Sequence, residues 1–238
     1  MIIFYITGTS SGIGKALAEQ ALQIEESIVF GFSRTCSIKH ANYKHIAIDL
    51  GNVDEVLKLN FEKHSDAYKV VLINNAGIVG EVKPIGKQAN ESIVNVFNLN
   101  TICPVILTNK LLQTYEGIDV SIVIVNISSG AARHPIESWT PYCASKAAID
   151  MFSQVLQAEN VYDTKKIRAF SIAPGIVDTN MQQQVRTSKP KDFPHLDKFI
   201  DYKNKGQLVL PEVVAQKILT IVENPEDHQN VLLDVRQL

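Results

Sequence analysis

Tyr142 and Lys146 are the residues of this sequence whose spacing points most directly to chemistry. They lie four positions apart in residues 141–160, whose pattern predicts a helix, so both side chains project from one helical face. A nearby ammonium group favours phenolate, so we expect the pKa of Tyr142 to lie below its usual value of about 10. Such a tyrosine can donate a proton to a forming alkoxide and regain it afterwards, as a general acid does.

Ser129 follows an apolar run at 121–127 that predicts a strand, and it precedes the helix that carries Tyr142. The carboxyl ends of parallel strands border the ligand crevice, so we expect Ser129 and Tyr142 to converge there, with the serine hydroxyl holding a carbonyl oxygen. Taken singly, Ser129 is explained as a cap, Tyr142 as a partly buried aromatic and Lys146 as a solvated cation. Together with the glycine turn described next, they favour a catalytic site.

The segment TGTSSGIG, residues 7–14, lies between an apolar run and a predicted helix. Glycine costs about 1 kcal/mol relative to alanine within a helix, so these glycines serve the backbone and not helix propensity. A strand that turns through glycines into a helix directs free N–H groups and the positive end of the helix dipole to one spot, which suits a phosphate. An ordinary tight turn is the alternative explanation.

Short apolar runs alternate with amphipathic stretches along the whole chain. This pattern predicts one α/β domain, residues 1–238, with a Rossmann-type doubly wound parallel sheet of about seven strands and helices on both faces. The predicted strands cover residues 2–6, 27–32, 45–48, 70–73, 121–127, 167–172 and 231–235, and the predicted helices cover residues 14–22, 53–64, 90–112, 141–160 and 211–223.

A polar segment at about residues 178–206, before the last predicted helix, interrupts this alternation. It contains Pro190 and Pro194 and is too long for a routine connection, so we expect a lid over the substrate site, with a solvated excursion as the alternative.

Composition narrows the function classes. With 45% apolar residues and a net charge of −2, the 238-residue chain has no basic excess for nucleic acid or anionic membranes, and it lacks a long apolar segment or a signal peptide. We therefore expect a cytoplasmic protein that binds neither nucleic acid nor membranes. Three scattered cysteines and six scattered histidines form neither a disulfide framework nor a metal-ligand pattern, so no metal is expected.

Four motifs, taken in their order along the chain, identify a resemblance to a known family. TGTSSGIG at residues 7–14, NNAG at 74–77, Ser129 followed by YCASK at 142–146, and PGIVDT at 174–179 resemble the short-chain dehydrogenase/reductase family across nearly the whole chain. The resemblance implies an NAD(P)-dependent oxidoreductase. It assigns Tyr142 as the acid/base, Lys146 as its partner and as a ligand of the nicotinamide ribose, and Ser129 as the residue that orients the carbonyl.

The resemblance also places the family's relay asparagine on Asn100, with Asn98 as the nearby decoy. It implies that Gly8 permits the turn, Gly12 allows the pyrophosphate to approach, and Gly14 lets helix and strand pack together. Asn74 braces the sheet. The cofactor-binding residues implied by the resemblance are Gly8, Ser10, Ser11, Gly12, Ile13, Gly14, Ser33, Arg34, Asp49, Leu50, Asn75, Ala76, Gly77, Tyr142, Lys146, Pro174, Gly175, Val177 and Thr179.

The second predicted strand indicates which dinucleotide binds. It ends in VFGFSRT, where Ser33 stands at the position of the acidic residue that usually binds the ribose hydroxyls of NAD. Without that carboxylate nothing repels a 2′-phosphate, and Arg34 offers a charge-assisted fork to bind it. We therefore predict NADP(H). Since cellular NADP is commonly kept reduced, carbonyl reduction is the favoured direction.

The segments VDTNMQQQVR and SWTPYC resemble the sepiapterin reductase branch and its bacterial relatives, the benzil reductases that form (S)-benzoin. The resemblance implies a vicinal dicarbonyl substrate, benzil-like or a pterin. Trp139, Met181, Phe193, Phe199 and Tyr202 are candidates for an aromatic pocket or, alternatively, local packing of the lid. Asp234 is a candidate pterin anchor, although a one-residue shift would put Leu233 there instead.

Broad apolar faces on 90–112 and 141–160 predict, by family resemblance, a homodimer or homotetramer with two-fold contacts. A non-catalytic NADP-binding regulatory protein is the alternative from a different class; it is disfavoured because Tyr142 and Lys146 are both present.

Overall fold

The computed structural model describes residues 1–159 and 166–238 of the chain. Its strands are β1 (Ile2–Thr7), β2 (Ser27–Ser33), β3 (Tyr43–Ala47), β4 (Lys69–Asn74), β5 (Ser121–Ile127), β6 (Ile167–Ala173) and β7 (Leu232–Asp234). Its α-helices are α1 (Gly12–Ala21), α2 (Val53–Lys58), α3 (Asn90–Phe97), α4 (Cys103–Thr114), α5 (Thr140–Glu159), α6 (Asn180–Arg186), α7 (Leu196–Asn204) and α8 (Pro211–Glu223).

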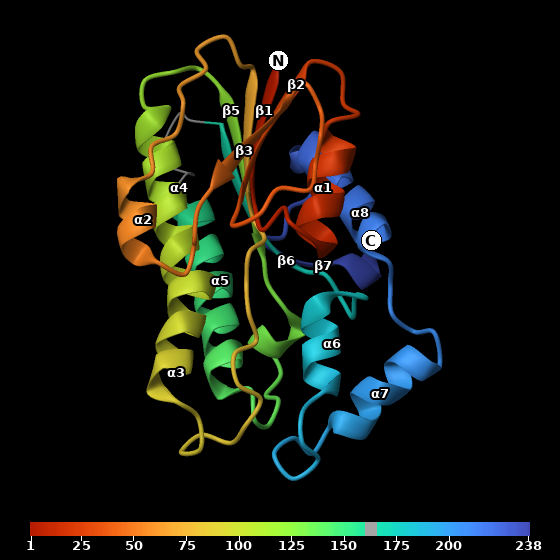
Figure 1. Ribbon diagram of the computed structural model, residues 1–238. Coiled ribbons are helices and arrows are strands. Elements are labelled where there is room, and N and C mark those ends of the chain that lie inside the picture. Colours follow the sequence, from red (N-terminus) through yellow and green to blue (C-terminus); the bar gives the residue numbers. More distant parts are fainter. Residues whose placement is uncertain (160–165) are drawn as a thin grey trace.

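The seven strands form one parallel sheet in the order β3-β2-β1-β4-β5-β6-β7. The strand order reverses between β1 and β4, so the crevice for a ligand opens at their carboxyl ends. In Figure 1 these ends point down the page, towards the lid helices α6 and α7. The predicted doubly wound α/β fold is thereby confirmed.

Helices cover both faces of the sheet (Figure 1). One face packs against α1 and α8, with Leu17 and Ile218 among the buried apolar residues. The other face packs beneath α2, α4 and α5, where Leu107 and Leu156 contribute to a second buried cluster. The central strands β1, β4 and β5 are apolar on both faces for this reason, and their sequences lack polar alternation.

The helix predicted over residues 53–64 ends at Lys58. Leu59 adopts an extended conformation, which lets Phe61 leave the helical path. Phe61 packs edge-on against Tyr5 and Phe32, with ring centroids 4.8 and 5.9 Å apart. Burial of this aromatic side chain outweighs the local helical pattern.

The helix predicted over residues 90–112 is divided into α3, a π-helical turn at Asn98–Ile102, and α4. Pro104 has no N–H with which to bond the carbonyl group of Asn100, so the regular i to i−4 ladder cannot run through this point. The turn brings Asn100 inward, as described below.

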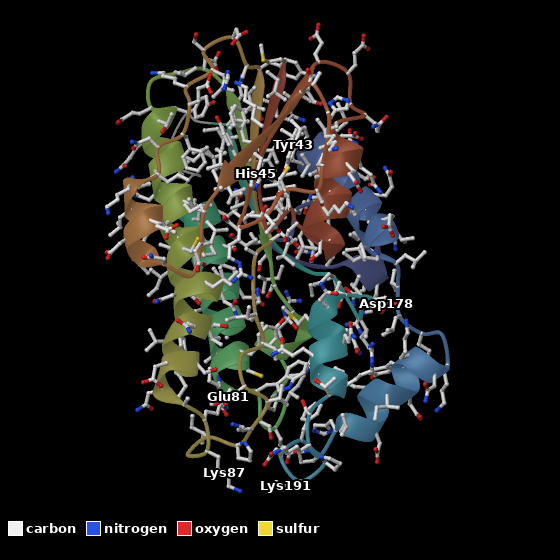
Figure 2. All side chains as sticks on the ribbon, in the orientation of Figure 1. Tyr43, His45, Glu81, Lys87, Asp178 and Lys191 are labelled. Atoms are coloured by element: carbon white, nitrogen blue, oxygen red, sulfur yellow. The ribbon has the colours of Figure 1, made fainter. Side chains whose placement is uncertain are left out.

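The helix predicted over residues 141–160 is observed at Thr140–Glu159, and Asn160 lies outside the described residues. The segment predicted as a lid contains two helices, α6 and α7, that the sequence did not reveal. Asp178, labelled in Figure 2 beside α6, accepts a hydrogen bond from Lys203 of α7 at 2.6 Å and so joins the two ends of the lid. None of the described helices has the length and hydropathy that crossing a membrane requires.

Candidate active site

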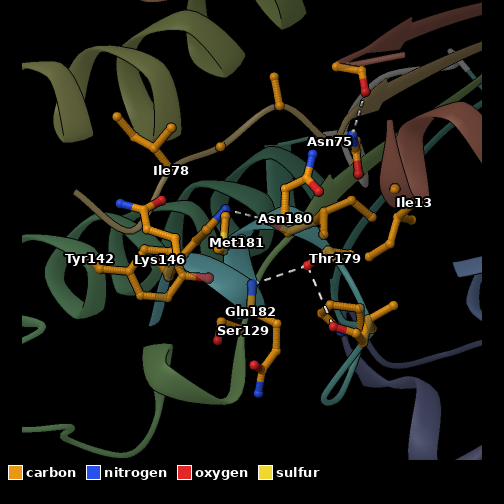
Figure 3. A pocket seen from close by; sticks show the side chains of 18 of the residues that line it. Ile13, Asn75, Ile78, Ser129, Tyr142, Lys146, Thr179, Asn180, Met181 and Gln182 are labelled. Atoms are coloured by element: carbon orange, nitrogen blue, oxygen red, sulfur yellow. Dashed lines mark hydrogen bonds between the residues drawn. The ribbon is translucent and has the colours of Figure 1, made fainter. Parts of the chain in front are cut away.

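A cavity of about 1140 Å³ lies at the carboxyl ends of the strands. It extends from the glycine turn after β1, past the ends of β2, β4, β5 and β6, to the lid helices. Figure 3 shows Tyr142, Lys146 and Ser129 around this pocket, together with Thr179 and Gln182 from the start of the lid. An elongated cavity that joins a glycine turn to a catalytic group has the form that a dinucleotide and a second molecule together require.

The glycine turn is built for an anion. Gly8 and Gly12 have φ angles of 76° and 57°, in the left-handed region that favours glycine. Ser11, the residue before α1, is extended and makes no side-chain cap, and the first turn of α1 carries no acidic residue. The Gly8 N–H donates to the Phe32 carbonyl oxygen at 2.8 Å, whereas the N–H groups at the start of α1 are available to a phosphate, and no acidic side chain in the first turn of α1 repels one.

Gly14 fixes how α1 packs on the sheet. A Cβ atom at this position would overlap the carbonyl oxygen of Gly8 and the Nδ2 atom of Asn75. Asn75 in turn donates from Nδ2 to the carbonyl oxygen of Thr7 at 2.9 Å. The close packing predicted for Gly14 is thus present, and it joins the ends of β1 and β4 across the switch point.

Tyr142 and Lys146 lie on one face of α5, as predicted. The Nζ atom of Lys146 is 5.8 Å from the centre of the Tyr142 ring and donates to the carbonyl oxygen of Ile127 at 2.7 Å. Both residues are buried. Ser129 is half-buried, and its Oγ accepts a hydrogen bond from the Ala131 N–H at 3.1 Å, so the capping role considered from the sequence is also real.

Burial determines the protonation of these groups. It raises the pKa of Tyr142 to about 12, and the neighbouring Ser129 hydroxyl only partly opposes this. The prediction that Lys146 sets a lowered Tyr142 pKa therefore has the wrong sign here, because desolvation of the phenolate dominates. Tyr142 keeps its proton at neutral pH, which is the form that a proton donor needs. Burial also lowers the pKa of Lys146 to about 8, while Asp150 acts to raise it.

Asn100 is buried beneath the cavity wall. Its Oδ1 accepts from the Ile78 N–H, and its Nδ2 donates to the Ile78 carbonyl oxygen, each at 2.9 Å. Nδ2 also donates to Ser145 Oγ at 3.1 Å. A Cβ atom on Gly77 would lie 3.2 Å from the Asn100 Oδ1 and 3.5 Å from the Lys146 Nζ, so the loop after β4 places the two side chains near each other.

All the residues predicted to bind the cofactor line the cavity, except Gly14, which lies beneath the turn. Asn74 braces the sheet as predicted, because its Nδ2 donates to Asn126 Oδ1 at 2.9 Å and to Thr108 Oγ1 at 3.3 Å. Ser33 is buried, and its hydroxyl donates to the Thr35 carbonyl oxygen at 2.8 Å.

On the substrate side, Trp139, Met181, Phe199 and Tyr202 line the cavity. Phe193 lies behind them, stacked on Trp139 with a 5.7 Å centroid distance. Trp139 is also edge-on to Tyr142 at 5.4 Å, so the aromatic wall continues to Tyr142. Within the described residues the buried indole N–H of Trp139 has no hydrogen-bond partner.

Asp234 is not among the residues that line the cavity. Its carboxylate accepts hydrogen bonds from the Nε and the backbone N–H of Arg236, both at 2.9 Å, and these contacts lower the pKa of Asp234. Arg236 itself lines the cavity and packs against Gly175. Sequence reasoning missed Arg236; the signal was its position directly beyond the carboxyl end of the last strand.

Comparison with known proteins gives a consistent result. The family model for short chain dehydrogenases matches residues 3–190. The chain is 35% identical to benzil reductase ((S)-benzoin forming) from Bacillus cereus over 97% of both chains, and 31% identical to sepiapterin reductase from Mus musculus over 92% of this chain and 90% of that one. Among solved structures, the KRED1-Pglu enzyme matches with a TM-score of 0.82 and 25% identity, over 98% of this chain and all of the other.

Replacing Gly14 by alanine tests the packing at the switch point. Gly14→Ala should lower the free energy of unfolding by about 1–3 kcal/mol, because the added methyl group meets backbone and a hydrogen-bonded amide. Gly130→Ala is the control, since nothing lies within 4 Å of a Cβ atom there, and its effect should stay within about 0.5 kcal/mol. Urea unfolding followed by circular dichroism measures both; equal midpoints for the two variants would contradict this account.

Proposed function

Because this chain belongs to the short-chain dehydrogenase family, we propose that it is an NADPH-dependent reductase. Its substrate in this proposal is a vicinal, benzil-like aromatic diketone, of which it reduces one carbonyl group. The observation that carries this proposal is the convergence of Tyr142, Lys146 and Ser129 at a cavity whose far wall is aromatic. Family membership and the reductases among its relatives already make the chain an oxidoreductase.

The residues of the cavity fit a dinucleotide. The glycine turn lines the cavity at the start of α1, and Arg34 lines it too, with its side chain exposed. Among the described carboxylates none pairs with Arg34, so its guanidinium is available to a 2′-phosphate. When bound, the reduced nicotinamide supplies the hydride that adds to the carbonyl carbon.

Side chains of this protein bind and protonate the carbonyl oxygen of the substrate. The Ser129 hydroxyl donates a hydrogen bond to the substrate carbonyl, which polarises it and fixes its position. As negative charge grows on that oxygen, Tyr142 donates its phenolic proton, which burial has kept in place at neutral pH. The resulting phenolate is stabilised by the Lys146 ammonium beneath it and regains a proton from solvent. By family resemblance Asn100 takes part in that return path.

An aromatic diketone suits the substrate side because its flat rings match the wall formed by Trp139, Phe199 and Tyr202. A pterin is the second candidate, supported by the sepiapterin reductase relatives, but the carboxylate predicted to anchor it, Asp234, is engaged by Arg236.

Exposed apolar side chains on two helices support an oligomeric assembly. Val94 on α3 and Met151 and Val155 on α5 are large apolar side chains that are about half exposed. We propose that these helices pair in a homodimer or homotetramer, and that the protein acts in the cytoplasm without binding nucleic acid or membrane. Sedimentation equilibrium measures the assembly state.

Activity is tested by following NADPH absorbance with benzil and with sepiapterin, using NADH as the control cofactor. We expect faster turnover of benzil. Tyr142→Phe should lower that rate by about a hundredfold or more while NADPH still binds, because the variant lacks only the proton donor. Unchanged turnover in Tyr142→Phe would rule out this donor, and NADPH binding without turnover of any carbonyl in the wild type would favour a regulatory protein instead.

Cofactor choice is tested at Arg34. Arg34→Ala should weaken the apparent affinity for NADPH about tenfold or more and leave that for NADH nearly unchanged, because only NADPH carries the 2′-phosphate. Lys39→Ala is a matched control, since Lys39 is an exposed cation in the same connection but does not line the cavity. Equal losses for both cofactors in Arg34→Ala would remove the 2′-phosphate assignment.

A further inference from the structure

Asp150 is a buried carboxylate one helical turn beyond Lys146 on α5. A charge in the interior is costly unless it is paired and hydrogen-bonded, so the partners of this carboxylate determine what it contributes.

The Asp150 carboxylate joins the segments that carry the site. Its Oδ1 accepts hydrogen bonds from Ser128 Oγ at 2.6 Å and from Ser171 Oγ at 2.7 Å, and its Oδ2 accepts from Arg133 Nε at 2.9 Å. Ser128 directly precedes Ser129, Arg133 ends the short helical turn that Ser129 caps, and Ser171 lies on β6, which leads to the cofactor segment beginning at Pro174. One side chain on α5 thus fixes the ends of β5 and β6 relative to Tyr142.

The hydrogen bond between Asp150 and Ser128 also affects the orientation of the next residue, Ser129. Ser129 has an extended backbone, with φ −159° and ψ 155°, and adjacent side chains in extended chain point to opposite sides. While Ser128 is held inward by Asp150, Ser129 is turned to the cavity. Loss of the anchor would release the orientation of the hydroxyl group that holds the substrate carbonyl.

Few charged groups surround Lys146 and Asp150. Lys146 lies against the Tyr142 ring and one turn from Asp150 on its own helix, with the Ile127 carbonyl from β5 and the uncharged Asn100 amide from the π-helical turn nearby. Asp150 pairs with Arg133, and beyond Arg133 lies the Asp234–Arg236 pair at the end of β7. Asp150 is the carboxylate whose charge favours the ammonium form of Lys146.

This inference rests on the function proposed above. We propose that Asp150 is a positioning residue of this enzyme: it holds the ends of β5 and β6 against α5, orients Ser129 through Ser128, and places a negative charge one helical turn from the buried Lys146. Burial alone drives Lys146 towards the neutral amine, and Asp150 opposes that tendency. A neutral lysine would stabilise the Tyr142 phenolate less than an ammonium group does, and it would bind a ribose hydroxyl less strongly.

The direct test is an NMR titration of protein labelled with [ε-¹³C]lysine, in which the Lys146 signal is identified by its loss in Lys146→Arg. In Asp150→Asn, which keeps the shape of the side chain, Lys146 should titrate about one pH unit or more lower than in the wild type, since the negative charge that favours the ammonium form is gone. An unchanged or higher midpoint in folded Asp150→Asn overturns the proposal.

Two further variants separate charge from packing. Arg133→Gln removes a cation next to Asp150, so the Lys146 midpoint should rise or stay, and a fall would overturn the proposal even if Asp150→Asn did not fold. Ser171→Ala removes one hydrogen bond to Asp150 without removing charge; it should lower the unfolding midpoint and leave the Lys146 midpoint in place.

The pH dependence of kcat tests whether the charge of Asp150 affects catalysis. In Asp150→Asn the basic limb of kcat for benzil should move to lower pH with Lys146, so that the loss relative to wild type is about fivefold or more at pH 8 and small at pH 6. A uniform loss at all pH values would contradict the charge role. If the wild type does not reduce benzil, the proposed function fails, while the NMR midpoints still decide the effect of Asp150 on Lys146.

Discussion

A buried ammonium group is the constraint on which the rest of this site depends. Lys146 is enclosed by α5, the end of β5 and the loop after β4, in surroundings that disfavour its charge. The carbonyl oxygen of Ile127, 2.7 Å from Nζ, and the carboxylate of Asp150 one turn away compensate for the lost hydration. Because that carbonyl belongs to the last residue of β5, the charge can be accommodated only if helix and strand keep their register.

That register also explains how the two halves of the cavity meet. On the cofactor side, Gly14 packs against Gly8 and Asn75, so the ends of β1 and β4 are held by backbone contacts that leave no freedom. On the substrate side, the wall consists of side chains: Trp139, which directly precedes α5, and aromatic residues of the lid. Tyr142 stands at the boundary, with Trp139 at 5.4 Å on one side and Lys146 on the other.

Much of this arrangement was predictable because it depends on local patterns. The apolar runs gave the seven strands within one or two residues, and α8 begins and ends where its sequence predicts. The glycine turn and the Tyr142–Lys146 spacing placed the site, since a helix fixes which side chains share a face. The choice of Asn100 over Asn98 is consistent with their burial, because only Asn100 is fully enclosed.

The remaining features depend on contacts between distant segments. The early end of α2 follows from burial of Phe61 against Tyr5, and the division between α3 and α4 accompanies Asn100 binding the loop at Ile78. The sign of the Tyr142 pKa shift depends on burial of the phenol group, which a helical spacing does not reveal. The engagement of Asp234 by Arg236 is likewise a property of the folded chain end.

The central claim is that this cavity brings a nicotinamide, a carbonyl carbon and the Tyr142 proton together in one fixed geometry. The most direct measurement uses NADPH deuterated at either face of nicotinamide C4, with benzil as substrate and analysis of the benzoin by mass spectrometry and chiral chromatography. The account predicts deuterium at the carbinol carbon from one of the two labelled forms only, in a single benzoin enantiomer. Benzoin without deuterium from either form, or racemic benzoin labelled from both, would contradict it.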